Sequence, residues 1–149
     1  MRSNYNMNEE MYLGGSFLKE AVKNLEVKIT NVVTSDYNGT EVFKVTFKVE
    51  SGNHEGKEFN TSYFMNLPGE KPDGTPTRGT IWLFRRLMVA CGFFTEDDKN
   101  VRHVTEDFDE KMLVGKTCVV DAEYQGDDKK YLNATNERYL DDFLKGQAV

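Results

Sequence analysis

The alternation of apolar and polar positions predicts strands in the first half of the chain. From Leu25 to Ile29 every second residue is apolar, and this alternation breaks at residues 31–33. A period of two is typical of a strand with one buried face. A break in phase indicates a bulge or a strand that bends across two sheets. We therefore expect a bent first strand over residues 25–33.

Two further strands are predicted over residues 41–49 and 57–66, each with one apolar and one mainly polar face. Asn38-Gly39 favours a tight turn before the first of them, and a turn over 51–56 separates the two. The three strands would form an antiparallel meander with Tyr63 in its core. The positions expected on its outer face are Val42, Lys44, Thr46, Lys48, Asn60, Ser62, Phe64 and Asn66.

The alternation of apolar and polar residues ends before residues 67–79. This segment contains all three prolines and predicts a long exposed loop. A mostly apolar run follows and predicts a helix over 81–91, with Thr80 as its N-terminal cap and Gly92 as its end. Arg85 and Arg86 would lie on its exposed stripe beside Trp82. A charged insertion over 93–104 and a short second helix over 105–114 complete this part.

Alternation returns over 116–124 and 130–136, so two more strands are expected, joined by a turn over 126–129. The order is three strands, a helix, then two strands. This is the order of a five-stranded OB-fold barrel, with a second short helix added, and a five-stranded α+β sheet remains the alternative. The interpretation divides the chain into a flexible segment 1–15, one mainly β domain 16–136 and a tail 137–149.

Charge is distributed unevenly within a net charge of −6. Residues 16–86 carry ten Lys/Arg and nine Asp/Glu, whereas residues 87–149 carry eight and fourteen. The acidic runs of the second half are either solvated loops or an acidic surface kept away from a binding groove. A net negative chain does not favour indiscriminate coating of nucleic acid.

The candidate chemistry of the chain points away from catalysis. Cys91 and Cys118 match no metal spacing and lie in apolar stretches, which indicates buried reduced thiols. No paired carboxylates or Ser/His/Asp set stands out, so we expect neither an enzyme nor a cofactor or metal. No apolar run approaches the roughly 20 residues of a membrane helix, and the polar start lacks a signal-peptide pattern. We expect a cytoplasmic protein without a membrane partner.

Four successive runs give a more specific resemblance: FLKEAVKNLEVKITNVV, VFKVTFKVESGNHEGKEFNTSYFMNL, TIWLFRRLMVACGF and LVGKTCVVDAEYQGDDKKYLNATN. Over residues 16–136 they resemble small phage-encoded single-stranded DNA-binding proteins with an OB-fold. The shared pattern is a G-x-x-x-G-K turn into an aromatic third strand, a helix ending in G-F, and G-K-x-x-x-V before the fourth strand. One departure is the C-terminus, where Asp141-Asp142-Phe143 is followed by LKGQAV rather than ending an acidic tail.

The resemblance implies binding of single-stranded DNA in phage replication or recombination, inside a host cell. Such binding needs cations for phosphates and exposed aromatic faces for bases. Lys44, Lys48 and Phe64 share the predicted outer face and are the first candidates. The alternatives are a solvated face for the lysines and packing of Phe64 under the proline-rich segment.

The other candidates lie in turns, in the proline-rich segment and on the helix. They are Tyr37, Lys71, Arg78, Arg85, Arg86, Lys129, Lys130 and Tyr131. Each has a plain alternative as a surface residue without a ligand. Replication or recombination proteins and a second copy of the chain are further partners compatible with this function.

A rival hypothesis is an OB-fold interaction module, such as a phage accessory factor, that binds a protein and no nucleic acid. The feature that separates the two is whether Lys44, Lys48 and Phe64 form one exposed basic and aromatic surface. A metal-dependent nuclease is a third hypothesis, and it would need clustered acidic residues that the sequence does not show.

Overall fold

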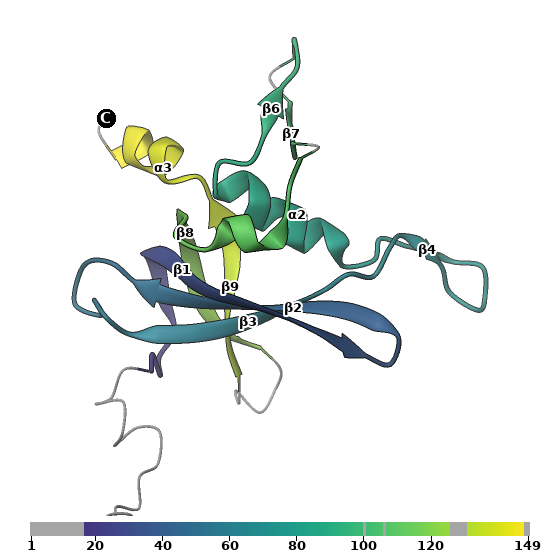
Figure 1. Cartoon of the computed structure of the whole chain (residues 1–149), viewed down its shortest axis with the longest axis horizontal. Coiled ribbons are helices and arrows are strands. Elements are labelled where there is room, and N and C mark those ends of the chain that lie inside the picture. The colour runs from purple at the N-terminus through teal and green to yellow at the C-terminus, as the bar shows by residue number, and fades with distance from the viewer. Residues whose placement is uncertain (1–16, 100, 106, 126–130, 148–149) are drawn as a thin grey trace, which may run out of the picture.

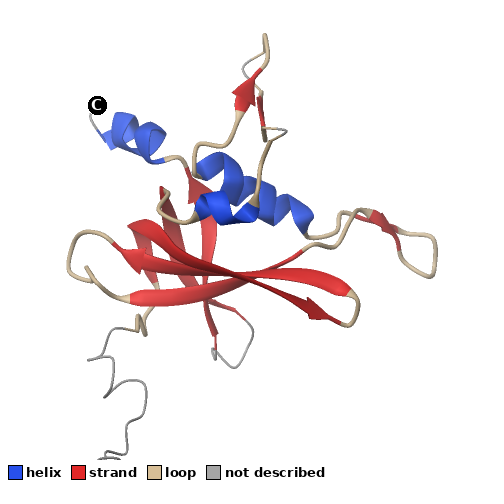
Figure 2. Ribbon diagram, in the orientation of Figure 1, coloured by secondary structure: helices blue, strands red, loops and turns tan. Residues whose placement is uncertain are grey.

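The computed structural model describes residues 17–99, 101–105, 107–125 and 131–147, and it is mainly β (Figures 1 and 2). The expected segment 1–15 and the turn 126–129 lie outside the described residues. In chain order the elements are β1 (Val22–Tyr37), β2 (Thr40–Val49), β3 (Glu58–Phe64), β4 (Gly69–Glu70), β5 (Pro76–Thr77), α2 (Ile81–Ala90), β6 (Thr95–Glu96), β7 (Arg102–His103), the 3₁₀ helix η2 (Glu110–Leu113), β8 (Thr117–Gln125), β9 (Tyr131–Arg138) and α3 (Leu140–Gln147).

Five antiparallel strands form the main sheet in the order β3-β2-β1-β8-β9. The long β1 pairs with β2 and with β8, and its register shifts between Ile29 and Asn31. This shift confirms the predicted bulge. The turn between β1 and β2 is also as predicted, because Asn38 and Gly39 have φ values of 52° and 87°. The Asp36 carboxylate accepts a hydrogen bond from the Gly39 N–H at 3.0 Å.

The two edge strands of this sheet approach each other. The Thr61 hydroxyl of β3 accepts a hydrogen bond from the Ala134 N–H of β9 at 2.7 Å. Further along both strands, the Tyr63 hydroxyl donates to the Glu137 carboxylate at 2.5 Å. Both residues of the second contact lie further toward the C-terminus than those of the first, so β3 and β9 run in the same direction. We call the line along which these two strands meet the seam. No backbone ladder joins them among the described residues, and the sheet is strongly curled but open.

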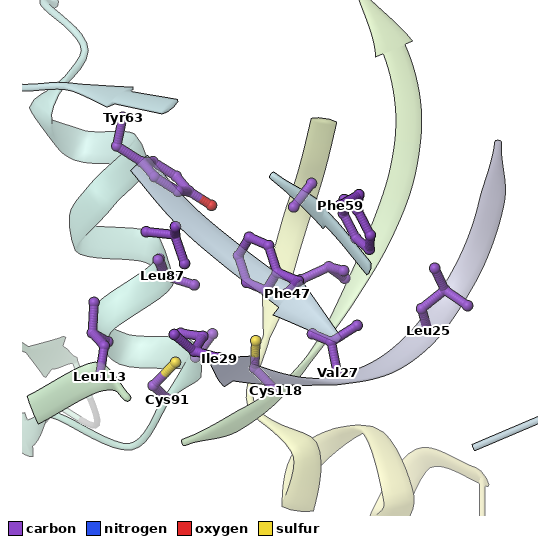
Figure 3. Packing of buried hydrophobic residues seen from close by; sticks show 14 of the residues in the cluster. Leu25, Val27, Ile29, Phe47, Phe59, Tyr63, Leu87, Cys91, Leu113 and Cys118 are labelled. Atoms are coloured by element: carbon purple, nitrogen blue, oxygen red, sulfur yellow. The ribbon is translucent and has the colours of Figure 1, made fainter. Parts of the chain in front are cut away.

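The core lies between the inner face of this curled sheet and α2. Figure 3 shows the packing of Phe47, Ile29, Leu87 and Leu113, all of which are fully buried. Burial of each such side chain stabilises the fold by about 1.5–3 kcal/mol. Tyr63 is buried in this cluster as predicted. Cys91 and Cys118 are buried free thiols, also as predicted.

The helix α2 covers one end of the curled sheet and starts close to where β3 ends (Figure 1). Thr80 is the N-cap residue of α2, as predicted, but its side chain makes no capping hydrogen bond. Its hydroxyl instead donates to the Phe64 carbonyl at 2.6 Å, because this position links the start of the helix to the end of β3. The preceding Gly79 has φ 73°, and a Cβ there would lie 2.4 Å from the Asn66 carbonyl oxygen.

The second helix predicted over 105–114 is reduced to the single turn of η2. Asp109 has extended backbone, and its side chain accepts a hydrogen bond from the Lys111 N–H at 2.9 Å. The cap therefore starts helical structure five residues later than predicted. Leu113 anchors the turn in the core, where it is fully buried.

Two short hairpins project from the body of the molecule (Figure 1). The proline-rich segment forms β4–β5, which lies outside the main sheet and is exposed, as the loop prediction requires. The charged insertion forms β6–β7. The chain then leaves β9 at Arg138, two residues beyond the expected end of the strand, and enters α3. Within the described residues, no helix combines the length and apolar character that crossing a bilayer requires.

Candidate nucleic-acid interface

The outer face of β1, β2 and β3 carries an exposed cation beside two aromatic rings. Lys44 lies opposite Ser62 of β3, and Phe64 lies opposite the adjacent outer position Val42. Phe64 is 37% exposed and Tyr37 is 63% exposed. The two rings meet edge to face, with centroids 6.0 Å apart and planes at 83°. The register of two ladders therefore brings residues 37, 44 and 64 onto one surface, which we call the β3 face.

A groove of about 850 Å³ follows β3 along its seam with β9. Lys44 and Phe64 line it, together with the polar side chains of Asn60 and Ser62. The opposite wall includes Tyr124, Leu132 and Asn133, and the start of the described chain at Phe17, Leu18 and Lys19 also contributes. Glu58 also lines the groove, which thus combines two lysines, one acid, polar groups and aromatic side chains in a depression rather than on a flat surface.

The cations of this face differ in their surroundings. Lys44 has no acidic side chain as a partner among the described residues, and its cross-strand neighbours Val33 and Ser62 are uncharged. Lys48 stands further along β2, directly opposite Glu58 on one side and Lys28 on the other. The positive charge at Lys44 is therefore the better placed of the two for a phosphate.

A second set of predicted residues lies around α2, and there Arg86 is part of a buried network. Its Nε donates to the Glu137 carboxylate at 2.6 Å, and the Glu137 side chain is only 1% exposed. The second Glu137 oxygen accepts the hydrogen bond from Tyr63. Burial, and then the nearby Glu137 charge, raise the pKa of Tyr63 well above its ordinary value. Arg86 thus neutralises a buried carboxylate of the fold.

Arg78 and Arg85 are the exposed cations of this region. The Arg78 guanidinium lies over the ring of Trp82 at 3.7 Å from its centroid. The Trp82 Nε1–H donates to the Gly79 carbonyl at 3.2 Å, which fixes the ring against the start of the helix. Neither arginine has an acidic partner among the described residues. We call residues 78, 82 and 85 the α2 platform.

The α2 platform borders a cleft of about 1250 Å³ between α2, the β6–β7 hairpin, the end of β9 and α3. Two further arginines line the cleft, and both have carboxylate partners. Arg102 donates to Asp142 at 2.5 Å, and Arg138 donates to Asp121 at 3.1 Å. Much of the remaining lining is apolar, including Phe84, Met88 and Phe108.

Asp121 is the buried acid at the base of the Arg138 contact. Burial acts to raise the pKa of this carboxyl, but hydrogen bonds from the Asn24 N–H, Arg138 and Asn136 outweigh it and hold the pKa below its usual range. Asn24 adopts a positive φ of 59°, which places its N–H 2.9 Å from the carboxylate oxygen. Asp121 therefore remains ionised and ties the start of β1 to the end of β9.

Of the remaining candidates, only Lys71 has a described side chain. Lys71 lies at the exposed β4–β5 hairpin, outside the lining of the groove and of the cleft. Lys129 and Lys130 lie outside the described residues. Tyr131 begins β9, and its side chain lies outside the description. The candidates that the structure brings together therefore lie on the β3 face and on the α2 platform, with Arg86 in the interior network between sheet and helix.

Sequence reasoning missed one aromatic side chain of the groove. Tyr124 continues the alternation of Cys118 and Ala122, which are fully buried, yet it is only half-buried near the end of β8. Its hydroxyl instead bonds to the Lys19 carbonyl, and its ring lines the groove. Its place next to the predicted turn was the available signal, because β8 ends at Gln125 and the core face of the sheet ends with the strand.

Among the described residues, no group of three or more His, Cys, Asp or Glu side chains is arranged to hold a metal ion. No protein-family model matches the chain, and a search of curated proteins finds no similar sequence.

Proposed function

We propose that this chain is a sequence-tolerant, non-enzymatic single-stranded DNA-binding protein that acts in phage DNA replication or recombination. The observation that carries the proposal is the β3 face, where Lys44, Phe64 and Tyr37 lie together on an exposed surface beside a groove. The phage setting is supported by the sequence resemblance over residues 16–136.

The arrangement of the strands supports an OB-like barrel as the scaffold. The three-strand meander, the return through β8 and β9, and the common direction of β3 and β9 at the seam are features of that fold. In an OB-fold, oligonucleotides bind the face of the second and third strands between two flanking loops. In this chain, that face is the β3 face, and the Asn38-Gly39 turn lies at one end of it.

The chemistry of the groove fits a single strand rather than a duplex. Exposed aromatic rings stack on unpaired bases, at about 1–3 kcal/mol per base, without reading the sequence. The polar side chains of Asn60 and Ser62 offer further hydrogen bonds along the same wall. Because the described lining of the groove contains two lysines, Lys19 and Lys44, and one acid, Glu58, we expect moderate affinity with a moderate dependence on salt.

Fluorescence anisotropy of a labelled oligo(dT) at low and high salt, with unlabelled duplex as competitor, tests the proposal. We expect binding that weakens as salt rises and that duplex DNA does not displace. Absence of binding at micromolar protein and low salt would contradict the proposal.

Two variants locate the binding surface. Phe64→Ala removes the stacking ring, and we expect the affinity for oligo(dT) to fall about fivefold or more. Met112→Ala is its control, because Met112 is 45% exposed on η2, away from both cavities. Lys44→Glu lowers affinity and reduces the salt slope by about 0.7 for the lost phosphate contact. Lys111→Glu, an equal charge change on the exposed side of η2, should leave both unchanged.

A further inference from the structure

The groove of the β3 face and the cleft of the α2 platform meet at the start of α2. Phe64, Thr80 and Leu83 line the groove. Their chain neighbours Met65, Ile81 and Trp82 line the cleft. The two depressions are therefore separated only by the junction between the end of β3 and the first turn of the helix, where the Thr80 hydroxyl bonds to the Phe64 carbonyl.

At the end of the cleft nearest the groove, two arginines have no carboxylate partner among the described residues. Arg86, Arg102 and Arg138 are each within 3.1 Å of an acidic oxygen. Arg78 and Arg85 are exposed and have no acidic partner among the described residues. Both line the cleft, one before and one after Trp82.

The contact between Arg78 and Trp82 prepares this arginine for an anion. A guanidinium stacked on an aromatic ring is held in place by the cation–π attraction, so less side-chain freedom is lost when it binds. Its N–H donors match the oxygens of a phosphate. Trp82 is itself held by its hydrogen bond to the Gly79 carbonyl. Gly79 has a positive φ, and it lies so close to the Asn66 carbonyl oxygen that a Cβ would not fit there.

We propose that a single strand bound in the groove continues past Thr80 onto the α2 platform, where Arg78 and Arg85 contact its phosphates. This inference rests on the proposed function and specifies the length of strand that the protein covers. The β3 face binds the first segment through Phe64 and Lys44, and the platform binds the next. A path from the sheet face to the helix end makes the footprint longer than the face alone.

An acidic peptide is the other ligand class that two arginines over an apolar cleft would attract. Continuity with the groove favours the nucleic acid, because Phe64 and Met65 are adjacent in the chain and line one depression each. A polyglutamate peptide therefore serves as a competing probe in the test.

The test compares oligo(dT) of about 6 and about 15 nucleotides, lengths within the range of OB-fold footprints. The full chain and its Arg78→Ala/Arg85→Ala variant are titrated with both by fluorescence anisotropy. We expect the variant to bind the longer strand about tenfold more weakly and the shorter strand within about twofold of the unmodified chain. Its salt slope on the longer strand should fall by about 1.4, for two lost phosphate contacts.

The control variant is Lys23→Ala/Lys111→Ala, which removes two exposed cations outside both cavities and should change neither length. An unchanged affinity of the Arg78→Ala/Arg85→Ala variant for the longer strand overturns the inference. Binding of polyglutamate that depends on these two arginines, with DNA binding unaffected, overturns it in favour of an acidic peptide. Failure of the unmodified chain to bind either length contradicts the proposed function instead.

Discussion

The β3 face and the α2 cleft contain the same kinds of residue, cations beside aromatic rings, but the fold uses them differently. In the cleft, Arg86, Arg102 and Arg138 each contact a carboxylate within 3.1 Å. On the β3 face, Lys44 has no such partner among the described residues. The cleft is thus largely neutralised within the molecule, whereas the face keeps its charge for a ligand.

This difference shows why a count of charges is a poor guide to a binding surface. The acidic residues of the second half of the chain include Asp121, Glu137 and Asp142. These three form ion pairs with arginines rather than remaining unpaired at the surface. Changes to the paired arginines and acids of the cleft should therefore alter stability, whereas changes to the unpaired cations Lys44, Arg78 and Arg85 should alter binding.

Glu137→Ala should have the largest effect. It leaves the Arg86 guanidinium and the buried Tyr63 hydroxyl without their shared partner. Removing one member of a buried ion pair costs about 3 kcal/mol or more, and we expect the lower end because Arg86 is 34% exposed. Urea denaturation followed by circular dichroism measures the free energy of unfolding.

Asp142→Asn is the matched control for that experiment. It weakens the Arg102 pair, whose side chains are 31% and 43% exposed, and exposed pairs contribute about 0–1 kcal/mol. Equal losses in the two variants would mean that burial does not distinguish the Glu137 network from a surface pair.

The strands were predictable from sequence because the alternation of apolar and polar residues indicates which side of each strand is buried. Phe43, Val45 and Phe47 alternate with exposed or half-buried positions, and the same period identified Lys44 as outward-facing. The bulge after Ile29 appeared as a break in that period. Lys44 and Phe64 could therefore be predicted on one face before their register was known.

The arginines of the helix could not be separated in this way. Arg85 and Arg86 were expected on one exposed stripe, yet only Arg85 is exposed. The partner of Arg86 is Glu137, 51 positions further along the chain, and nothing local to either residue indicates the pair. The partner of the Thr80 hydroxyl could not be predicted for a similar reason, since this N-cap residue of α2 donates to the Phe64 carbonyl of another element. Long-range pairing of polar groups requires the tertiary structure.

Tyr37→Ala should have the second largest effect, and on binding rather than stability. The ring is 63% exposed and contacts Phe64 only by its edge. Loss of a stacking ring costs about 1 kcal/mol, which is about fivefold in the affinity for oligo(dT). The free energy of unfolding should change by less than about 0.5 kcal/mol. Leu144→Ala, at a residue 51% exposed on α3, controls for loss of an exposed apolar side chain.

Acid should weaken the fold through Asp121, and we expect a smaller effect. The folded-state pKa of this carboxyl lies below its usual range, so its contribution is complete above the ordinary value near 4 and is lost as pH falls through the folded pKa. The stability advantage of the unmodified chain over Asp121→Asn should shrink between pH 7 and pH 3. Urea midpoints at a series of pH values measure it. A constant difference would show that Asp121 is not held ionised by Arg138 and Asn24.

Lys48→Ala should have the smallest effect, and it tests the comparison within the β3 face itself. Lys48 points to the same side of β2 as Lys44, but its cross-strand neighbours are Glu58 and Lys28. Glu58 offsets the local positive charge and would repel a phosphate approaching Lys48. Lys48 also lies outside the lining of the groove, which Lys44 joins. We therefore expect Lys48→Ala to weaken oligo(dT) binding by about twofold at most, and Lys44→Ala to weaken it more in the same titration. If the two variants weakened binding equally, the strand would follow the length of β2 rather than the groove, because only a contact along the whole strand would engage both lysines alike.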